Sequence, residues 1–177
     1  MIQLEGKKVL LRSIRPDDAS EEYISWLNDN EVRRGLESPP PKPYTMPMLT
    51  SYLAAVLSDE NNCMLAIIDK ENNKHIGNCK LHNFNLINKT CELGIMIGNK
   101  EYWGKGFGRE VCEALILYAF DELKIRKVWL TVHANNSAAM ALYKKLAFVE
   151  EGRLKAHTLS DGVYVDKLIM SLFSSKS

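Results

Sequence analysis

The sequence predicts an α+β fold, in which a central mixed and mainly antiparallel twisted sheet of about seven strands is flanked by helices in a single domain over residues 1–177. A chain of 177 residues that is 46% hydrophobic and 25% charged has ordinary globular composition and the length for one sizeable core. Helix-spaced apolar segments lie on both sides of a middle part in which strand-like segments alternate with turn-forming clusters. This order, without internal repeats, favours helices packed on an antiparallel or mixed sheet.

The first third of the chain predicts one strand and three helices. Residues 7–14 are rich in valine, leucine and isoleucine and predict a strand, and Pro16 is expected to open a helix. A second short helix is expected over residues 31–36. The proline-rich residues 39–43 predict an extended connector, which is either a lid over a substrate cleft or a plain surface linker, before a helix over residues 46–57.

The rest of the chain predicts strands and two longer helices. Turn-forming clusters separate three expected antiparallel strands, and a hairpin with Asp161-Gly162 at its turn closes the chain. The expected strands are 64–68, 75–84, 90–97, 127–132, 148–154 and 163–172, and the expected helices are 106–123 and 136–146.

Charge and hydropathy exclude several classes of protein. The 23 Lys and Arg residues balance 22 Asp and Glu residues, so no basic surface for nucleic acid is expected. No run approaches the length of a membrane span and the first residues lack the apolar core of a signal peptide, so we expect a cytoplasmic protein without a membrane partner. The wide spacing of Cys63, Cys79, Cys91 and Cys112 predicts neither disulfides nor a metal site, but buried apolar side chains.

A glycine-rich loop stands between an expected strand and an expected helix. The stretch YWGKGFGR places Gly104, Gly106 and Gly108 directly before the amphipathic residues 109–120. A helix N-terminus has unpaired N–H groups and a partial positive charge, and glycines let a phosphate approach those groups. The spacing fits neither a Walker loop nor a Rossmann fingerprint. A phosphate cradle and a glycine-rich turn that binds nothing both fit this loop alone.

A second motif follows at residues 136–148, where Asn136, Ala139, Tyr143, Lys145 and Phe148 recur at the spacing Asn-x-x-Ala-x-x-x-Tyr-x-Lys-x-Gly-Phe, with alanine at the usual glycine position. Together with the glycine loop, this motif resembles the acetyl-CoA-binding half of the GNAT superfamily of N-acetyltransferases. The resemblance covers about residues 90–172. The loop departs from the superfamily pattern at its first position, where Trp103 replaces arginine or glutamine.

The resemblance implies an acetyl-CoA site. The pyrophosphate would bind to backbone N–H groups of the loop, with added charge from Lys105 and Arg109. The strand at 93–97 would splay from the strand at 128–132 and admit the pantetheine arm. Free N–H groups near Met96 and Ile97 would hydrogen-bond that arm. A bulge is expected at Gly94. The residues that the resemblance assigns to the cofactor are Ile95, Met96, Ile97, Gly104, Lys105, Gly106, Phe107, Gly108, Arg109, Asn136 and Lys145.

Two side chains are the candidates for proton transfer. By its motif position Tyr143 is the expected general acid that protonates the leaving thiolate, with core packing as the structural alternative. Glu92, on the strand beside the acceptor pocket, is the candidate general base, with a plain ion pair as its alternative. His82 and His133 are weaker candidates, and Asn136 is also expected to cap its helix.

The expected reaction is direct attack of a primary amine on acetyl-CoA in a ternary complex. The expected acceptor is a small molecule, either a polyamine held by carboxylates or an amino-sugar nucleotide held by cations. An N-terminus of a ribosomal or other protein, or a non-catalytic acyl-CoA-binding module, are the alternatives, and an exposed strand edge leaves a homodimer open. The carboxylates are Glu31, Glu37, Glu92 and Asp166, and the cations are Arg33, Arg34, Lys80 and Arg153.

Overall fold

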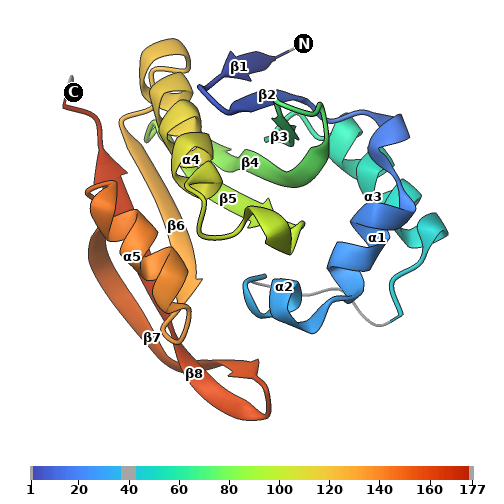
Figure 1. Cartoon of the computed structure of the whole chain (residues 1–177). Helices are drawn as coiled ribbons and strands as arrows, with labels where there is room; N and C mark the ends of the chain where they lie inside the picture. Colours follow the sequence, from blue (N-terminus) through green and yellow to red (C-terminus); the bar gives the residue numbers. More distant parts are fainter. Residues whose placement is uncertain (1, 37–42, 176–177) are drawn as a thin grey trace.

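The computed structural model describes residues 2–36 and 43–175 and contains one eight-stranded sheet in the order β1-β2-β3-β4-β5-β6-β8-β7 (Figure 1). Neighbouring strands are antiparallel except β5 and β6, which are parallel. The strands are β1 (Gln3–Glu5), β2 (Val9–Ser13), β3 (Asn62–Asp69), β4 (His75–Asn85), β5 (Thr90–Ile97), β6 (Lys127–His133), β7 (Val149–Ser160) and β8 (Val163–Phe173). The predicted α+β class and mainly antiparallel sheet are confirmed, with β1 as an additional strand.

Helices cover the two faces of the sheet, because the side chains of a central strand alternate between them. On β3, Leu65 and Ile67 pack with α4 (Phe107–Leu117), whereas Met64 and Ala66 pack with α1 (Glu21–Asn28) and α3 (Met46–Ser58). The short α2 (Asn30–Arg34) follows α1, and α5 (Ser137–Lys145) lies beside β6 and β7 in Figure 1. The molecule therefore has two hydrophobic clusters, one on each face.

The sheet opens between β5 and β6. Their parallel register covers only Thr90↔Lys127 to Glu92↔Trp129, whereas β5 stays paired with β4 up to Gly77↔Ile97. The last five residues of β5 thus have β4 on one side and an opening on the other, and the predicted splay is confirmed. The bulge expected at Gly94 is wrong, because the β4–β5 register is continuous there and shifts between His82 and Asn85 instead.

Local chemistry explains two other differences from the sequence prediction. Pro16 opens a 3-10 turn (Pro16–Asp18) rather than a helix, because Asp18 is held by the Arg12 guanidinium at 2.6 Å and by the Arg15 N–H at 2.7 Å. α1 begins later, after Ser20, whose hydroxyl accepts the Tyr23 N–H. The helix predicted over residues 106–123 is α-helical only to Leu117 and continues as a π turn (Tyr118–Glu122).

The remaining predicted segments are confirmed in outline. The hairpin turn at Asp161-Gly162 joins β7 and β8. Asp161 and Gly162 both have positive φ, as the turn requires. All four cysteines are free thiols and only Cys63 is not fully buried. The connector predicted at residues 39–43 lies almost entirely outside the described residues. Within the described residues, no helix has the length and apolarity to cross a membrane.

Candidate active site

The glycine loop lies at the start of α4 with its backbone open. Gly104 and Gly106 have φ of +71° and +87°, and a Cβ built on either would meet nothing within 4 Å. Gly106 is the N-cap of α4, so the first N–H groups of that helix follow it directly. The left-handed φ explains the glycines, and the open space above them is the property that a phosphate cradle needs.

A cleft of about 680 Å³ extends from this loop to α5. The residues assigned to the cofactor that line it are Ile95, Met96, Ile97, Gly104, Gly106, Gly108, Arg109, Asn136 and Lys145. Lys105 and Phe107 are not among the described residues that line it. The Phe107 ring packs edge-on against Tyr102 with ring centroids 4.9 Å apart, and the Lys105 carbonyl accepts the Lys8 ammonium at 3.0 Å.

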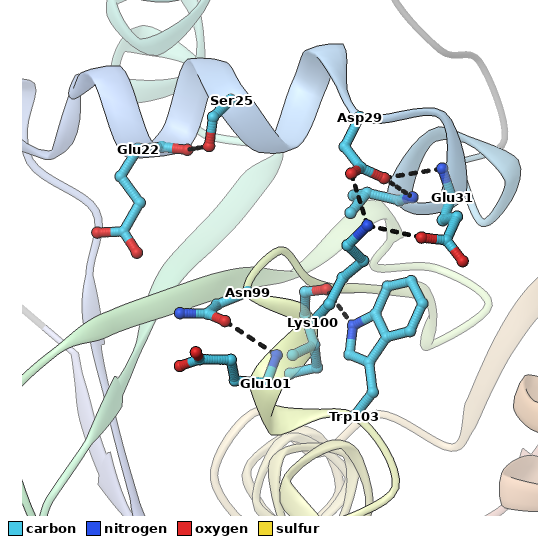
Figure 2. Close-up of polar contacts among 10 residues, drawn as sticks. Glu22, Ser25, Asp29, Glu31, Asn99, Lys100, Glu101 and Trp103 are labelled. Carbon is cyan, nitrogen blue, oxygen red and sulfur yellow. Dashed lines mark hydrogen bonds and ion pairs between the residues drawn. The ribbon is translucent and has the colours of Figure 1, made fainter.

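Trp103 directly precedes Gly104 at the start of this loop, where the superfamily pattern has arginine or glutamine. Its indole N–H donates to the Ile97 carbonyl at 2.8 Å (Figure 2). The Ile97 carbonyl therefore accepts its hydrogen bond from a side chain and not from the backbone of β4, whereas the Gly98 N–H donates to the Ile76 carbonyl on β4. Because the backbone groups of successive residues point to opposite sides of a strand, the N–H groups of Ile95 and Ile97 point toward the opening. The Met96 N–H faces β4 by the same alternation. Of the two predicted N–H donors, Ile97 therefore faces the opening and Met96 faces β4, whereas the Ile95 N–H is the second donor on the open side.

A second cavity of about 490 Å³ lies on the α1–α3 side of the opening. Residues of β4 and β5 form its floor, and its wall is formed by Tyr23, Leu27, Tyr44, Tyr52 and Met64. Six residues line both this cavity and the cofactor cleft, namely Gly35, Leu36, Ile95, Met96, Thr131 and Tyr143. Tyr143 is the ionisable side chain in that shared set of described residues.

Tyr143 is fixed by the way in which α5 ends. The Phe148 N–H donates to the Tyr143 carbonyl and the Ala147 N–H donates to the Lys144 carbonyl, which is the Schellman arrangement. The Phe148 and Tyr143 rings pack with centroids 5.8 Å apart. The motif spacing thus has a structural reason, because the glycine position has positive φ, here Ala147 at +64°. Burial raises the pKa of Tyr143, which keeps its hydroxyl protonated.

Glu92 lies at the last paired position of β5 and β6, where the opening begins. It is 5% exposed, lines the second cavity, and accepts the Asn83 side-chain N–H at 2.7 Å. His82, its partner across the β4–β5 ladder, lies 3.9 Å away. Glu92 and Tyr143 therefore line the same cavity, with a carboxylate at its floor and a hydroxyl at its junction with the cleft.

The other candidate carboxylates that the structure describes, Glu31 and Asp166, are engaged elsewhere. Glu31 and Asp29 both contact the Lys100 ammonium, at 2.6 and 2.8 Å, which raises the pKa of Lys100 (Figure 2). Asp166 pairs with Arg153 and accepts the Ala156 N–H. Glu37 lies outside the described residues.

Most of the candidate cations are also paired with protein groups. Arg34 pairs with Asp161 and Arg33 donates to the Leu27 carbonyl. Lys80 alone of the four candidate cations lines the second cavity. His133 lines the cofactor cleft, and His82 lines the second cavity.

Sequence reasoning missed several residues that line the second cavity. Asn78 lies on β4 with Lys80 and His82 at alternate positions, so the three share one face. The alternation in the stretch His75–Asn85 could have indicated this polar face. Tyr52 could not have been found in this way, because its approach to the second cavity depends on tertiary packing, whereas Tyr44 adjoins the proline-rich connector for which a lid was one of the two expectations.

The opening of the sheet, the glycine loop at the start of α4 and the second cavity together form a site in which two ligands can meet beside Tyr143. The sequence matches the family described as acetyltransferase (GNAT) domain over residues 8–149, and the chain belongs to that family. The predicted enzyme class, an N-acetyltransferase, is thereby confirmed.

Relatives extend over the whole chain. An uncharacterized N-acetyltransferase of Bacillus licheniformis is 28% identical over 97% of this chain and 96% of its own. The crystal structure of spermidine N-acetyltransferase from Vibrio cholerae in complex with CoA and spermine superposes with a TM-score of 0.86 at 26% identity, covering 97% of this chain and 98% of the other. That complex supports the predicted cofactor, acetyl-CoA. Ribosomal-protein-S5-alanine acetyltransferase from Vibrio fischeri has a TM-score of 0.83 at 18% identity over 99% and 98% of the two chains, which shows the shared fold.

Proposed function

We propose that this protein transfers the acetyl group of acetyl-CoA to a primary amine of a small molecule that enters the second cavity. The observation that carries the proposal is the meeting of two cavities at Tyr143, one with an open glycine loop and the other with a buried carboxylate. A donor and an acceptor that occupy the two cavities would meet at that junction, so no acyl-enzyme intermediate is needed.

The cofactor would lie along the cleft with its pyrophosphate on the loop and its pantetheine arm in the opening of the sheet. The N–H groups of Ile95 and Ile97 face that opening and can donate to the arm, and such a donor would polarise the thioester carbonyl. Lys145, Arg109 and Asn136 line the same cleft and can contact the nucleotide part.

Two protein groups would move protons. The incoming ammonium loses a proton to Glu92, directly or through a water, and the neutral amine attacks the thioester carbonyl carbon. A C–N bond forms and the C–S bond breaks, and the sulfur takes the hydroxyl proton of Tyr143. The nitrogen then gives its second proton to the Tyr143 phenolate, which leaves a neutral amide and a protonated tyrosine. Burial of Tyr143 favours this role, because a donor must be protonated at neutral pH.

A small acceptor fits the second cavity better than a protein segment does. The cavity holds about 490 Å³, which is within the range of small-molecule sites, and aromatic side chains form much of its wall. The spermidine acetyltransferase among its relatives supports a small amine as well.

The test is thiol release from acetyl-CoA with a panel of amines, with the product identified by mass. We expect turnover with at least one class of small amine, at a catalytic efficiency at least tenfold above that for a peptide N-terminus. A peptide acetylated as efficiently as every small amine would contradict the small-molecule acceptor. Tight CoA binding without turnover of any amine would contradict the reaction.

A further inference from the structure

The floor of the second cavity, here called the acceptor cavity because the proposed function places the amine there, contains a ladder of three residue pairs between β4 and β5. His82 faces Glu92, Lys80 faces Gly94, and Asn78 faces Met96. Residues two apart on a strand point to the same side, so these pairs present their side chains to one face, and all six line the acceptor cavity. Glu92 offers a hydrogen-bond acceptor at one end of the ladder, and Asn78 lies at the other end.

The orientation of the Asn78 amide follows from its neighbour His75. The Nε2 atom of His75 lies 2.9 Å from the Gly77 carbonyl oxygen and 3.0 Å from the Asn78 Oδ1 atom. A carbonyl oxygen can only accept, so Nε2 carries a hydrogen and donates. The group that it meets on Asn78 must then be the oxygen, and the amide nitrogen points the other way.

The Asn78 amide nitrogen has no partner among the described residues. Asn78 is 3% exposed, and its Nδ2 atom is buried without a hydrogen bond. An unpaired donor at such a depth is unfavourable, and buried amide groups ordinarily find an acceptor. No described group of the protein lies within hydrogen-bonding reach of Nδ2, and Asn78 lines the second cavity, so an occupant of that cavity is the remaining source of an acceptor.

We propose that Asn78 determines substrate choice by donating its amide hydrogen to an oxygen atom of the acceptor substrate. This inference rests on the proposed function and narrows it to primary amines that carry a hydroxyl, ether or carbonyl oxygen, of which amino sugars and amino alcohols are the simplest. The Glu92 end of the ladder receives the ammonium group and the Asn78 end receives the oxygen.

Polyamines lack this chemistry. At neutral pH their nitrogens are protonated and only donate hydrogen bonds, so a polyamine leaves Asn78 unpaired and places a cation beside a donor. A polyamine site would need several carboxylates, and Glu92 is the one candidate carboxylate that lines this cavity among the described residues. Sites that hydrogen-bond a substrate oxygen discriminate strongly against analogues that lack it.

The first experiment compares matched amines on the unmodified protein. Aminohexanol is compared with hexylamine, glucosamine with cyclohexylamine, and spermidine is added as the polyamine. We expect the better oxygen-bearing amine to exceed its matched partner and spermidine at least tenfold in kcat/KM. Equal values within both pairs, or a preference for spermidine, would overturn the inference.

The second experiment uses Asn78→Asp, which keeps the oxygen that His75 contacts and replaces the donor with an acceptor. We expect the preference for the oxygen-bearing amine to fall at least tenfold and the kcat/KM for spermidine to rise. Asn88→Asp, on an exposed turn, adds the same charge outside the cavity and serves as the control. A preference that survives in Asn78→Asp, with unchanged CoA affinity and melting temperature, would overturn the inference.

Failure of the proposed function gives a different result from failure of this inference. Without turnover of any amine, the same pairs are compared as ligands of the CoA-loaded protein by calorimetry. Tighter binding of the oxygen-bearing amine, weakened in Asn78→Asp, supports the role of Asn78 even then. Equal affinities overturn it.

Discussion

At the scale of single residues, the end of α5 links stability to chemistry. Tyr143 is the third residue from the helix end and Phe148 follows the turn, so the same two backbone bonds that close the helix hold the phenol in place. The side chain lies at the junction of both cavities. The structural alternative, core packing, and the predicted acid role are therefore compatible in one residue.

Tyr143→Phe tests the acid role. We expect kcat to fall at least tenfold, which corresponds to about 1.4 kcal/mol of lost transition-state stabilisation, with unchanged CoA affinity. Tyr164→Phe, an exposed hairpin position, is the matched control. Because burial raises the pKa of Tyr143, the kcat of the unmodified enzyme should show no decline as the pH rises toward 10, where an ordinary tyrosine begins to lose its proton. An undiminished kcat in Tyr143→Phe would remove this residue from the mechanism.

Ala147→Gly is expected to stabilise the protein. Ala147 has φ of +64°, which costs a residue with a Cβ about 1–2 kcal/mol, and glycine removes that strain against a smaller entropic cost. The net gain in the free energy of unfolding should be about 1 kcal/mol, measured by denaturant titration. A loss of stability would mean that the neighbouring Schellman bonds depend on the Cβ.

At the scale of elements, β5 and the start of α4 form one unit. After Glu92 the strand is no longer paired with β6. The Trp103 indole N–H donates to the carbonyl of Ile97, the last residue of the strand, just before the glycine loop begins. The loop then passes directly into α4 with Gly106 as the cap. This arrangement places outward N–H groups of the strand and of the helix start along one cleft.

Gly106→Val is expected to weaken CoA binding roughly a hundredfold, about 2.8 kcal/mol, because the side chain would occupy the open space over the loop. Gly162→Val is the matched control, since Gly162 also has positive φ, at +80°, with nothing within 4 Å of its Cβ position. Both variants carry similar backbone strain, so calorimetric CoA titration separates strain from blockage. Equal losses of affinity in the two variants would contradict the cradle.

Much of the fold and of the candidate site was predictable from the sequence, because the signals that mark them are local. Glycine spacing, the cap at Asn136 and the turn at Asp161-Gly162 each reflect a backbone conformation that few residues adopt. The 3-10 turn at Pro16 was not predictable, because it depends on the ion pair of Asp18 with Arg12 on β2. The place of Tyr52 in the second cavity was not predictable either, because it depends on which strands and helices meet across the sheet, which no local pattern encodes.

At the scale of the whole molecule, two cavities lie on different sides of one opening. The glycine loop borders the cleft on the α4 side, the second cavity lies on the α1–α3 side, and α5 contributes Tyr143 where they meet. If the proposed donor and acceptor occupy these two cavities, both reactants are in contact at once.

Initial-rate kinetics should therefore give intersecting lines in double-reciprocal plots, as for a ternary complex, and no acetylated protein should accumulate. Cys79 is the thiol that lines the acceptor cavity among the described residues, and its burial raises its pKa, so it is a poor nucleophile. Cys79→Ala should keep at least half of kcat. Parallel lines, or an acetyl group found on the enzyme by mass spectrometry, would contradict direct transfer.

The contact of Lys100 with Asp29 and Glu31 has a consequence for how the two ligands influence each other. Asp29 caps α2, and the residues just after α2, Gly35 and Leu36, border both cavities, while Lys100 belongs to the segment that leads into the glycine loop. A ligand in either cavity would contact Gly35 and Leu36, so filling one cavity should restrain a segment that also borders the other. We expect acetyl-CoA and the amine to tighten each other's binding by one and the same factor, as thermodynamic linkage requires, and that factor to shrink when Lys100 is replaced by methionine.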